Sequence, residues 1–96
     1  MKNKLKLRII LLFKGLQLPE DYKNLEFNKY KLKNNELELY LNDELINKIW
    51  YWDKNKSEEK NYKNGKINGY IYSWYGSGNL RYKYNYKNGK RIKNEE

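Results

Sequence analysis

Apolar and polar residues alternate in the middle of the chain, which is the pattern of β-strands with one buried face. Between residues 29 and 41 the apolar positions are Tyr30, Leu32, Leu37, Leu39 and Leu41. Asn34-Asn35 separates two alternating segments and has the length of a hairpin turn. A second turn at Asn42-Asp43 leads into the apolar segment 45–50. The pattern predicts β-hairpin structure in residues 29–48.

The pattern before residue 29 fits two kinds of structure. Leu5, Leu7, Ile9, Leu11 and Phe13 alternate as in a strand, whereas Leu5, Ile9, Leu12 and Leu16 share one face of a helix. A strand and a short helix therefore both stay open for this N-terminal cap. Pro19 lacks an amide donor and restricts the residue before it, so residues 15–24 are expected to form a connector within the N-terminal segment 1–28.

The second half of the chain contains an internal repeat. Tyr62-Lys63-Asn64-Gly65-Lys66 recurs unchanged 24 residues later as Tyr86-Lys87-Asn88-Gly89-Lys90, and the same shift carries Trp50-Tyr51 onto Trp74-Tyr75. Asn-Gly supplies two residues that tolerate positive φ, as the tight turns of β-hairpins require. The recurrence predicts successive hairpins in residues 49–96.

Between the two Asn-Gly turns, alternation assigns side chains to opposite faces. After Gly69, which marks a bulge or a close approach of the backbone, Tyr70, Tyr72 and Trp74 point one way and Ile71, Ser73 and Tyr75 the other. A turn at residues 76–79 follows. In the next strand Leu80, Tyr82, Tyr84 and Tyr86 alternate with Arg81, Lys83, Asn85 and Lys87. We expect that strand to have one apolar-aromatic face and one basic face.

These landmarks resemble the second variant form of the MORN repeat over residues 48–94. The matching residues are Tyr62, Asn64, Gly65, Gly69, Trp74, Tyr75, Gly78, Leu80, Tyr86, Asn88 and Gly89. The first copy departs from the pattern, with Lys54 and Lys56 at the positions of Gly78 and Leu80, and the last copy has Lys93 where Gly69 would recur.

The resemblance implies a mainly β fold of antiparallel hairpin repeats that form a short elongated sheet, to which the N-terminal strand or helix adds a cap. Residues 29–48 would then be a diverged repeat or part of the cap. The family implies a scaffold for protein contacts. Lipid-headgroup binding is also proposed for it, and related variant repeats occur in proteins labelled antitoxins.

Composition excludes several kinds of chemistry. The 96 residues include no His and no Cys, which rules out imidazole and thiolate nucleophiles, their metal sites and disulfides in this chain. The adjacent carboxylates of Glu58 and Glu59 fall on opposite faces of a strand, and we interpret them as solubilising charges. We therefore expect no enzymatic activity, no cofactor and no metal site.

Targeting signals are weak. The uninterrupted apolar run Ile9–Phe13 is too short for a signal peptide or a transmembrane segment. The sequence thus favours a cytoplasmic chain.

Charge adds a second class of partner. The chain has 21 Lys and Arg against 12 Asp and Glu, a formal net charge of +9. Alternating Tyr and cations in residues 80–87 suit single-stranded nucleic acid, whose bases stack on aromatic rings, and cations also suit anionic lipid. A half-buried strand of a β repeat explains the same pattern, so protein contact is the first hypothesis.

The sequence therefore predicts a non-enzymatic protein-binding scaffold or adaptor. The alternatives are an electrostatic binder of nucleic acid or anionic lipid headgroups, and an antitoxin-like protein that neutralises its partner. The candidate contact residues are Trp50, Trp52, Trp74, Tyr75, Arg81, Tyr82, Lys83 and Tyr84. Unpaired edge strands also make self-association an expectation.

Overall fold

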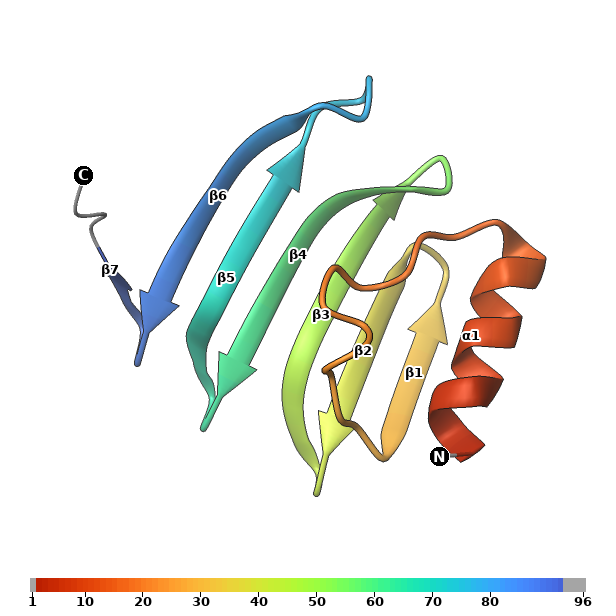
Figure 1. Ribbon diagram of the computed structural model, residues 1–96, viewed down its shortest axis with the longest axis horizontal. Helices are drawn as coiled ribbons and strands as arrows, with labels where there is room; N and C mark the ends of the chain where they lie inside the picture. The colour runs from red at the N-terminus through yellow and green to blue at the C-terminus, as the bar shows by residue number, and fades with distance from the viewer. Residues whose placement is uncertain (1, 93–96) are drawn as a thin grey trace.

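The computed structural model describes residues 2–92, with side chains from residue 4 onward. Its elements are α1 (Lys2–Lys14), β1 (Lys29–Lys33), β2 (Glu36–Leu41), β3 (Glu44–Trp52), β4 (Asn55–Lys63), β5 (Lys66–Trp74), β6 (Leu80–Lys87) and β7 (Lys90–Ile92). The strands form one antiparallel sheet in the order β1 to β7, each paired with its neighbours in sequence (Figure 1). The predicted mainly β fold of antiparallel hairpins is confirmed. Lys93, expected at a repeat position, lies outside the described residues.

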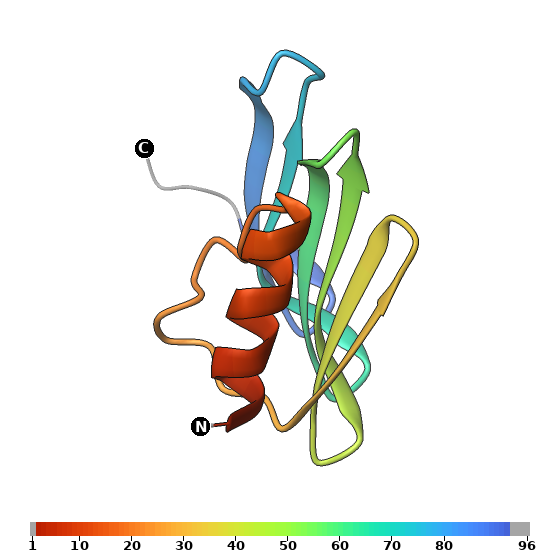
Figure 2. The ribbon, with the colours of Figure 1, turned by 90° about the vertical axis from the view of Figure 1, so that its right-hand side faces the viewer.

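The N-terminal cap is a helix that lies against one face of the sheet (Figure 2). Leu7 and Leu11 are fully buried, one helical turn apart. The other buried residues of this core are Phe27, Leu37, Leu39, Ile49 and Tyr51. The main core therefore lies between α1 and strands β2 and β3.

The helical face predicted from the sequence is wrong. Leu5, Ile9 and Leu12 point to solvent, whereas Leu16 packs against the core. Apolar residues occupy two sides of α1, so periodicity does not distinguish them. The helix ends with the amide of Leu16 donating to the carbonyl of Leu11 (2.8 Å), a C-terminal motif that brings these two side chains together on the buried side.

Tight turns with positive φ connect successive strands. Asn64 (φ 53°) and Gly65 (φ 80°) join β4 to β5, and Asn88-Gly89 repeats this between β6 and β7. The turns predicted at Asn34-Asn35 and Asn42-Asp43 are confirmed as well. Lys54, which replaces glycine in the repeat pattern, has φ 76° in the β3–β4 turn, a conformation that glycine adopts without strain.

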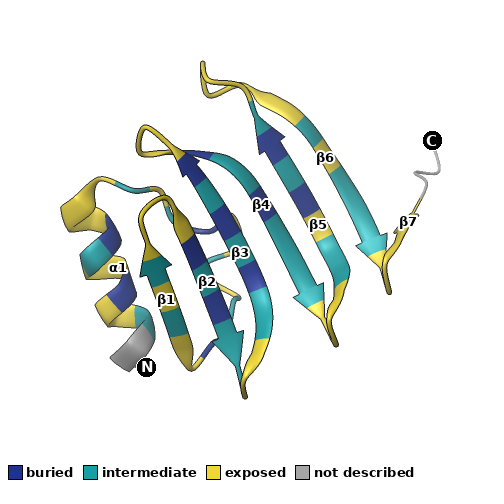
Figure 3. Cartoon of the chain, turned by 180° about the vertical axis from the view of Figure 1, so that it is seen from behind, coloured by how far each residue is buried: buried dark blue, intermediate teal, exposed yellow. Residues whose placement is uncertain are grey.

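The strand register defines two faces of the sheet. The face under α1, called the helix-bearing face, includes one row formed by Leu37, Ile49, Glu59, Tyr72 and Lys83. The next row, on the opposite face, is formed by Glu36, Trp50, Glu58, Ser73 and Tyr82. In Figure 1, α1 lies beside β1 and the connector passes in front of β2 and β3. The hydrogen bonds of Glu20 to Glu59 join the connector to β4, and β5 to β7 extend beyond it. Buried residues lie in β2 to β5, whereas β1, β6 and β7 contain none (Figure 3).

Candidate functional site

Three aromatic side chains follow one another along the helix-bearing face of β5. Tyr70 and Tyr72 have ring centroids 6.1 Å apart, and Tyr72 stacks on Trp74 at 5.4 Å with the ring planes 6° apart. Tyr70 is exposed, while Tyr72 and Trp74 are half-buried. The three rings lie on the same face because they occupy every second position of the strand, and successive side chains of a strand point to opposite faces. We call these three residues the aromatic ladder.

Lysine side chains lie over the rings of the aromatic ladder. The Nζ of Lys83 on β6 is 4.5 Å from the ring centroid of Tyr70 and 5.7 Å from that of Tyr72. The Nζ of Lys56 on β4 is 4.9 Å from the ring centroid of Trp74. These distances are within the range of cation–π attraction. The ladder therefore combines apolar surface with positive charge.

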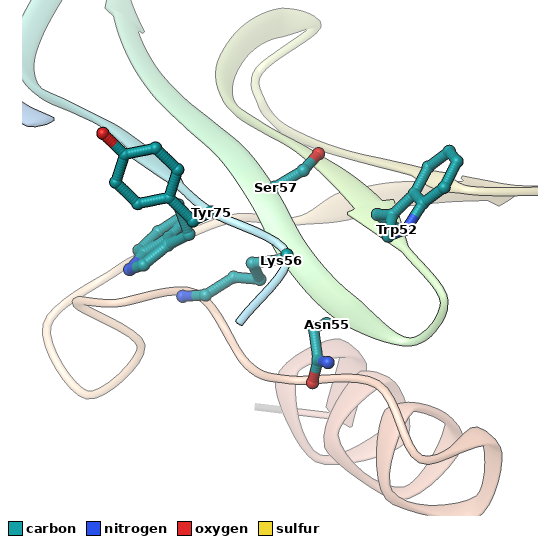
Figure 4. A pocket seen from close by; sticks show the side chains of 7 residues that line it. Trp52, Asn55, Lys56, Ser57 and Tyr75 are labelled. Atoms are coloured by element: carbon teal, nitrogen blue, oxygen red, sulfur yellow. The ribbon is translucent and has the colours of Figure 1, made fainter. Parts of the chain in front are cut away.

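A shallow hollow adjoins the Trp74 end of the aromatic ladder (Figure 4). Its volume is about 230 Å³. The residues that line it are Trp52, Asn55, Lys56, Ser57, Trp74, Tyr75 and Gly76. Trp52 and Tyr75 are 71% and 56% exposed, so large aromatic surface is accessible beside the ladder.

A buried ion pair fixes the border between the covered and the uncovered parts of the helix-bearing face. Lys56 Nζ lies 2.9 Å from Glu59 Oε1 and 2.7 Å from Glu20 Oε2, and it donates to the carbonyl of Leu18 at 2.8 Å. The side chains of Lys56 and Glu59 are 4% and 1% exposed. The amide of Glu20 donates to both carboxylate oxygens of Glu59, at 3.1 and 3.2 Å. We call Glu20, Lys56 and Glu59 the polar node.

The polar node holds part of the connector, residues 17–20, against β3 and β4. Gln17 adds two hydrogen bonds, because its side-chain oxygen accepts from the amide of Lys56 (2.9 Å) and its carbonyl accepts from the hydroxyl of Tyr51 (2.7 Å). A buried ammonium and a buried carboxylate are costly unless they are paired, and here both are. The polar node therefore places residues 17–20 of the connector beside Trp74, at one end of the ladder.

The structure divides seven of the eight predicted contact residues among three places. Trp74 and Lys83 lie on the helix-bearing face, Trp50, Tyr82 and Tyr84 on the opposite face, and Trp52 and Tyr75 at the strand ends beside the hollow. The exposed Arg81 lies with its guanidinium 5.7 Å from the ring centroid of Tyr82.

On the opposite face, the aromatic residues contact one another and nearby cations. Tyr82 and Tyr84 stack with centroids 4.9 Å apart, and the guanidinium of Arg91 lies 3.7 Å from the ring centroid of Tyr84. Lys48 and Lys60 lie over Trp50, with Nζ 5.0 and 5.5 Å from its ring centroid. The half-buried rings of this face therefore have charged neighbours within the chain.

The two Trp-Tyr pairs of the sequence repeat are not equivalent in the sheet. Trp50 pairs with Glu58, and Glu58 pairs with Ser73, so Ser73 occupies the row of Trp50. Tyr51 and Trp74 correspond instead, because each follows a β-bulge. The shift arises because the turn after β3 has two residues and the turn after β5 has five.

Sequence reasoning missed four residues of this site. Tyr70 and Tyr72 were expected to share the direction of Trp74 but were not predicted as contact residues. In the sequence, Lys56 was only a departure from the repeat pattern. A single charged residue at a position where the repeat has an apolar one was the feature that could have identified it. The interpretation of Glu59 as a solubilising charge is wrong, since its side chain is 1% exposed in the polar node.

Two tyrosines are expected to make stability sensitive to alkaline pH. Burial raises the pKa of Tyr51 well above its usual value, and burial together with the charge of Glu59 raises the pKa of Tyr72 to about 12. The unfolded chain loses these protons near pH 10 while the folded chain keeps them. The contribution of these two protonated tyrosines to the free energy of unfolding is therefore fully present below about pH 10, and it decreases as the pH rises toward about 12. Urea unfolding at about pH 9 and about pH 11 measures the loss.

Conservative variants check the assignment. Tyr51→Phe and Tyr72→Phe should each reduce the loss of stability between the two pH values, whereas the exposed Tyr75→Phe should leave it unchanged. An equal loss in all three variants would contradict the assignment.

Within residues 2–92, no group of three or more His, Cys, Asp or Glu side chains is placed to hold a metal ion. No helix in that part of the chain is long and apolar enough to cross a membrane. No family model, curated protein or solved structure matches the chain.

Proposed function

We propose that this chain is a non-enzymatic, MORN-like protein-binding module that binds an extended acidic segment of a partner protein along the aromatic ladder. The observation that carries the proposal is the ladder itself, Tyr70, Tyr72 and Trp74, whose exposed ring, Tyr70, lies beside Lys83. Aromatic residues and cations are enriched in protein interfaces, where rings supply area and charges supply specificity.

Charge supports an acidic partner. Residues 60–92 contain eight Lys or Arg and no Asp or Glu, so β5, β6 and β7 have no acidic side chain of their own. Glu59 and Glu20 share the ammonium of Lys56 in the polar node, and the charges of Glu59, Glu20 and Asp21 all act on Tyr72 in the middle of the ladder. A carboxylate of a partner would therefore meet cations at the Tyr70 end of the ladder, beside Lys83, where β5 to β7 supply no acidic side chain.

The shape of the site favours an extended segment. Side chains of the ladder recur at every second residue of β5, about 6.5–7 Å apart along the strand. An extended peptide that runs along β5 has the same spacing, so its alternate side chains match the intervals between the rings. The hollow beside Trp74, with Trp52 and Tyr75 exposed at its rim, offers an end point for such a segment.

Nucleic acid is the second candidate ligand, but the packing of the rings in the ladder disfavours it. A base needs a free ring face on which to stack. In the ladder, Tyr72 and Trp74 stack on each other, and the ammonium groups of Lys83 and Lys56 lie over the rings. The ladder therefore offers a ligand its ring edges and tyrosine hydroxyl groups, which are better suited to contacts with a protein than to stacking with a base.

Selection from a random-peptide display library on the immobilised chain tests the proposal. The enriched peptides should be acidic, and their affinity can be measured by fluorescence anisotropy. Lys83→Glu should weaken their binding at least about tenfold, because it places a negative charge against the acidic peptide. Tyr70→Ser should weaken it as well, since Tyr70 is the exposed ring of the ladder.

The matched control is Lys60→Glu, which reverses the same charge on the opposite face beside Trp50. It should weaken peptide binding much less than Lys83→Glu does. Equal losses in the two variants would show that net charge alone drives binding and would contradict the site. Binding of an oligothymidylate at physiological salt that is lost with Tyr70→Ser would overturn the proposal in favour of nucleic acid.

A further inference from the structure

Helix α1 carries an exposed apolar stripe that the core does not use. It consists of Leu5, Ile9, Leu12 and Phe13, which are 59%, 57%, 78% and 92% exposed. At about 100° per residue these positions fall within an arc of about 100° on the helix surface, opposite the buried Leu7 and Leu11. Side chains that are this exposed, contiguous and apolar mark a surface for interaction.

Cations border the stripe. Lys6 and Arg8 are exposed. Around the helix axis, Lys6 lies about 20° beyond Phe13 at one edge of the stripe, and Arg8 lies about 40° beyond Leu12 at the other edge. Residues 1–19 contain five Lys or Arg and no Asp or Glu. The helix thus presents an apolar strip between positive charges.

We propose that this stripe docks α1 on the surface of an anionic lipid bilayer, parallel to the membrane plane. An apolar helical face between Lys and Arg is the arrangement of helices that lie in the membrane interface, where apolar side chains enter the acyl boundary and cations meet anionic headgroups. Leu12 and Phe13, the most exposed of the four, project at the C-terminal end of the helix. A fluid bilayer accepts such projecting side chains without a matching pocket.

Charge argues against a second copy as the occupant. Two chains that paired through the stripe would bring Lys6 and Arg8 of one helix near the same cations of the other. No carboxylate in residues 1–19 could compensate them. Like charges across an interface are unfavourable, whereas the phosphates and serine carboxylates of anionic lipid supply the opposite charge.

The inference concerns residues separate from the aromatic ladder. The stripe lies on the outer side of α1, while the ladder lies on β5. The helix is anchored by the buried Leu7 and Leu11, so membrane binding requires no rearrangement of the sheet. The two sites can therefore be tested independently.

Vesicle co-sedimentation of the full chain tests the proposal, with phosphatidylcholine vesicles that contain phosphatidylserine or lack it. The wild-type chain should bind the anionic vesicles, and more weakly at high salt. Leu12→Ser with Phe13→Ser should lower partitioning at least about tenfold, because two apolar side chains leave the acyl boundary. Lys6→Gln with Arg8→Gln should lower it roughly 25-fold, at about fivefold per cation.

Matched variants separate the stripe from general charge. Lys63→Gln with Lys87→Gln removes the same charge at the ends of β4 and β6 and should change partitioning much less. Leu5→Ser with Ile9→Ser repeats the apolar test at the other end of the stripe, and circular dichroism confirms that each variant is folded. Lys83→Glu should retain most of the vesicle binding, which distinguishes this site from the aromatic ladder.

Three results would overturn the proposal. In one, folded stripe variants bind anionic vesicles as well as the wild type does. In another, the wild-type chain does not sediment with these vesicles at low salt. In the third, light scattering shows a dimer without lipid that Leu12→Ser with Phe13→Ser converts to a monomer, which would make a second copy the occupant.

Discussion

Replacing Glu59 with leucine should lower the free energy of unfolding by about 3–5 kcal/mol. The change leaves the ammonium of Lys56 buried, with Glu20 as its remaining carboxylate partner. It also removes the acceptor of the Glu20 amide and of the Asn47 side-chain amide, which donates to Glu59 Oε2 at 3.0 Å. Small domains are stable by about 5–15 kcal/mol, so the loss is a large fraction of the total. Urea unfolding followed by tryptophan fluorescence measures it.

The neighbouring residue provides the control. Glu58→Leu makes the same substitution on the opposite face, where Glu58 pairs with Trp50 and Ser73. It should change stability by no more than about 0.5–1 kcal/mol, because no ion pair is broken there in the described residues. Equal losses in the two variants would show that strand propensity or net charge, and not the polar node, accounts for the effect.

A double variant separates charge from hydrogen bonding. Lys56→Met with Glu59→Gln removes both buried charges, while the glutamine oxygen can still accept from the amides of Glu20 and Asn47. Most of the stability lost in Glu59→Leu should therefore be absent in the double variant, since replacing a whole buried pair is often close to neutral. A loss as large as that of Glu59→Leu would contradict the role of the pair.

The polar node also explains why the repeat pattern fails at Lys56. Lys56 and Leu80 occupy matching places, each paired with the residue that follows a bulge. Lys56 is buried because the connector covers it, whereas Leu80 is 50% exposed because nothing in the described chain covers it. A contact between residue 20 and residue 59 joins distant parts of the sequence, so no local pattern in the sequence predicts it.

What the sequence does predict is local. The turns at Asn64-Gly65 and Asn88-Gly89 follow from the φ angles that these residues tolerate, and alternation gives the faces of Tyr70, Tyr72 and Trp74. The sequence repeat aligns Trp50 with Trp74, but the two side chains lie on opposite faces, because a difference in turn length shifts the register by one residue. The site therefore depends on register and on long-range contacts beyond the repeat.

The buried face of the N-terminal helix could not be predicted from local pattern either, because apolar residues occupy two sides of it. A substitution on that buried face is the second change for which we expect a large loss of stability. Leu11→Ala should lower the free energy of unfolding by about 2–5 kcal/mol, because Leu11 is fully buried between the helix and the sheet. Thermal unfolding should show a fall in melting temperature of about 4–8 °C per kcal/mol for a chain of this size. Leu7→Ala, one turn earlier and equally buried, should have an effect of similar size.

The adjacent leucine is the sharpest control that this chain offers. Leu12→Ala has the same chemistry in the same helix, but Leu12 is 78% exposed, so stability should change by about 0.5 kcal/mol or less. If Leu12→Ala costs as much as Leu11→Ala, the helix buries the other side, and the apolar stripe that we propose for membrane docking does not exist. If only Leu11→Ala is costly, the exposed side of α1 contributes nothing to folding, and its four apolar residues require an explanation outside the fold.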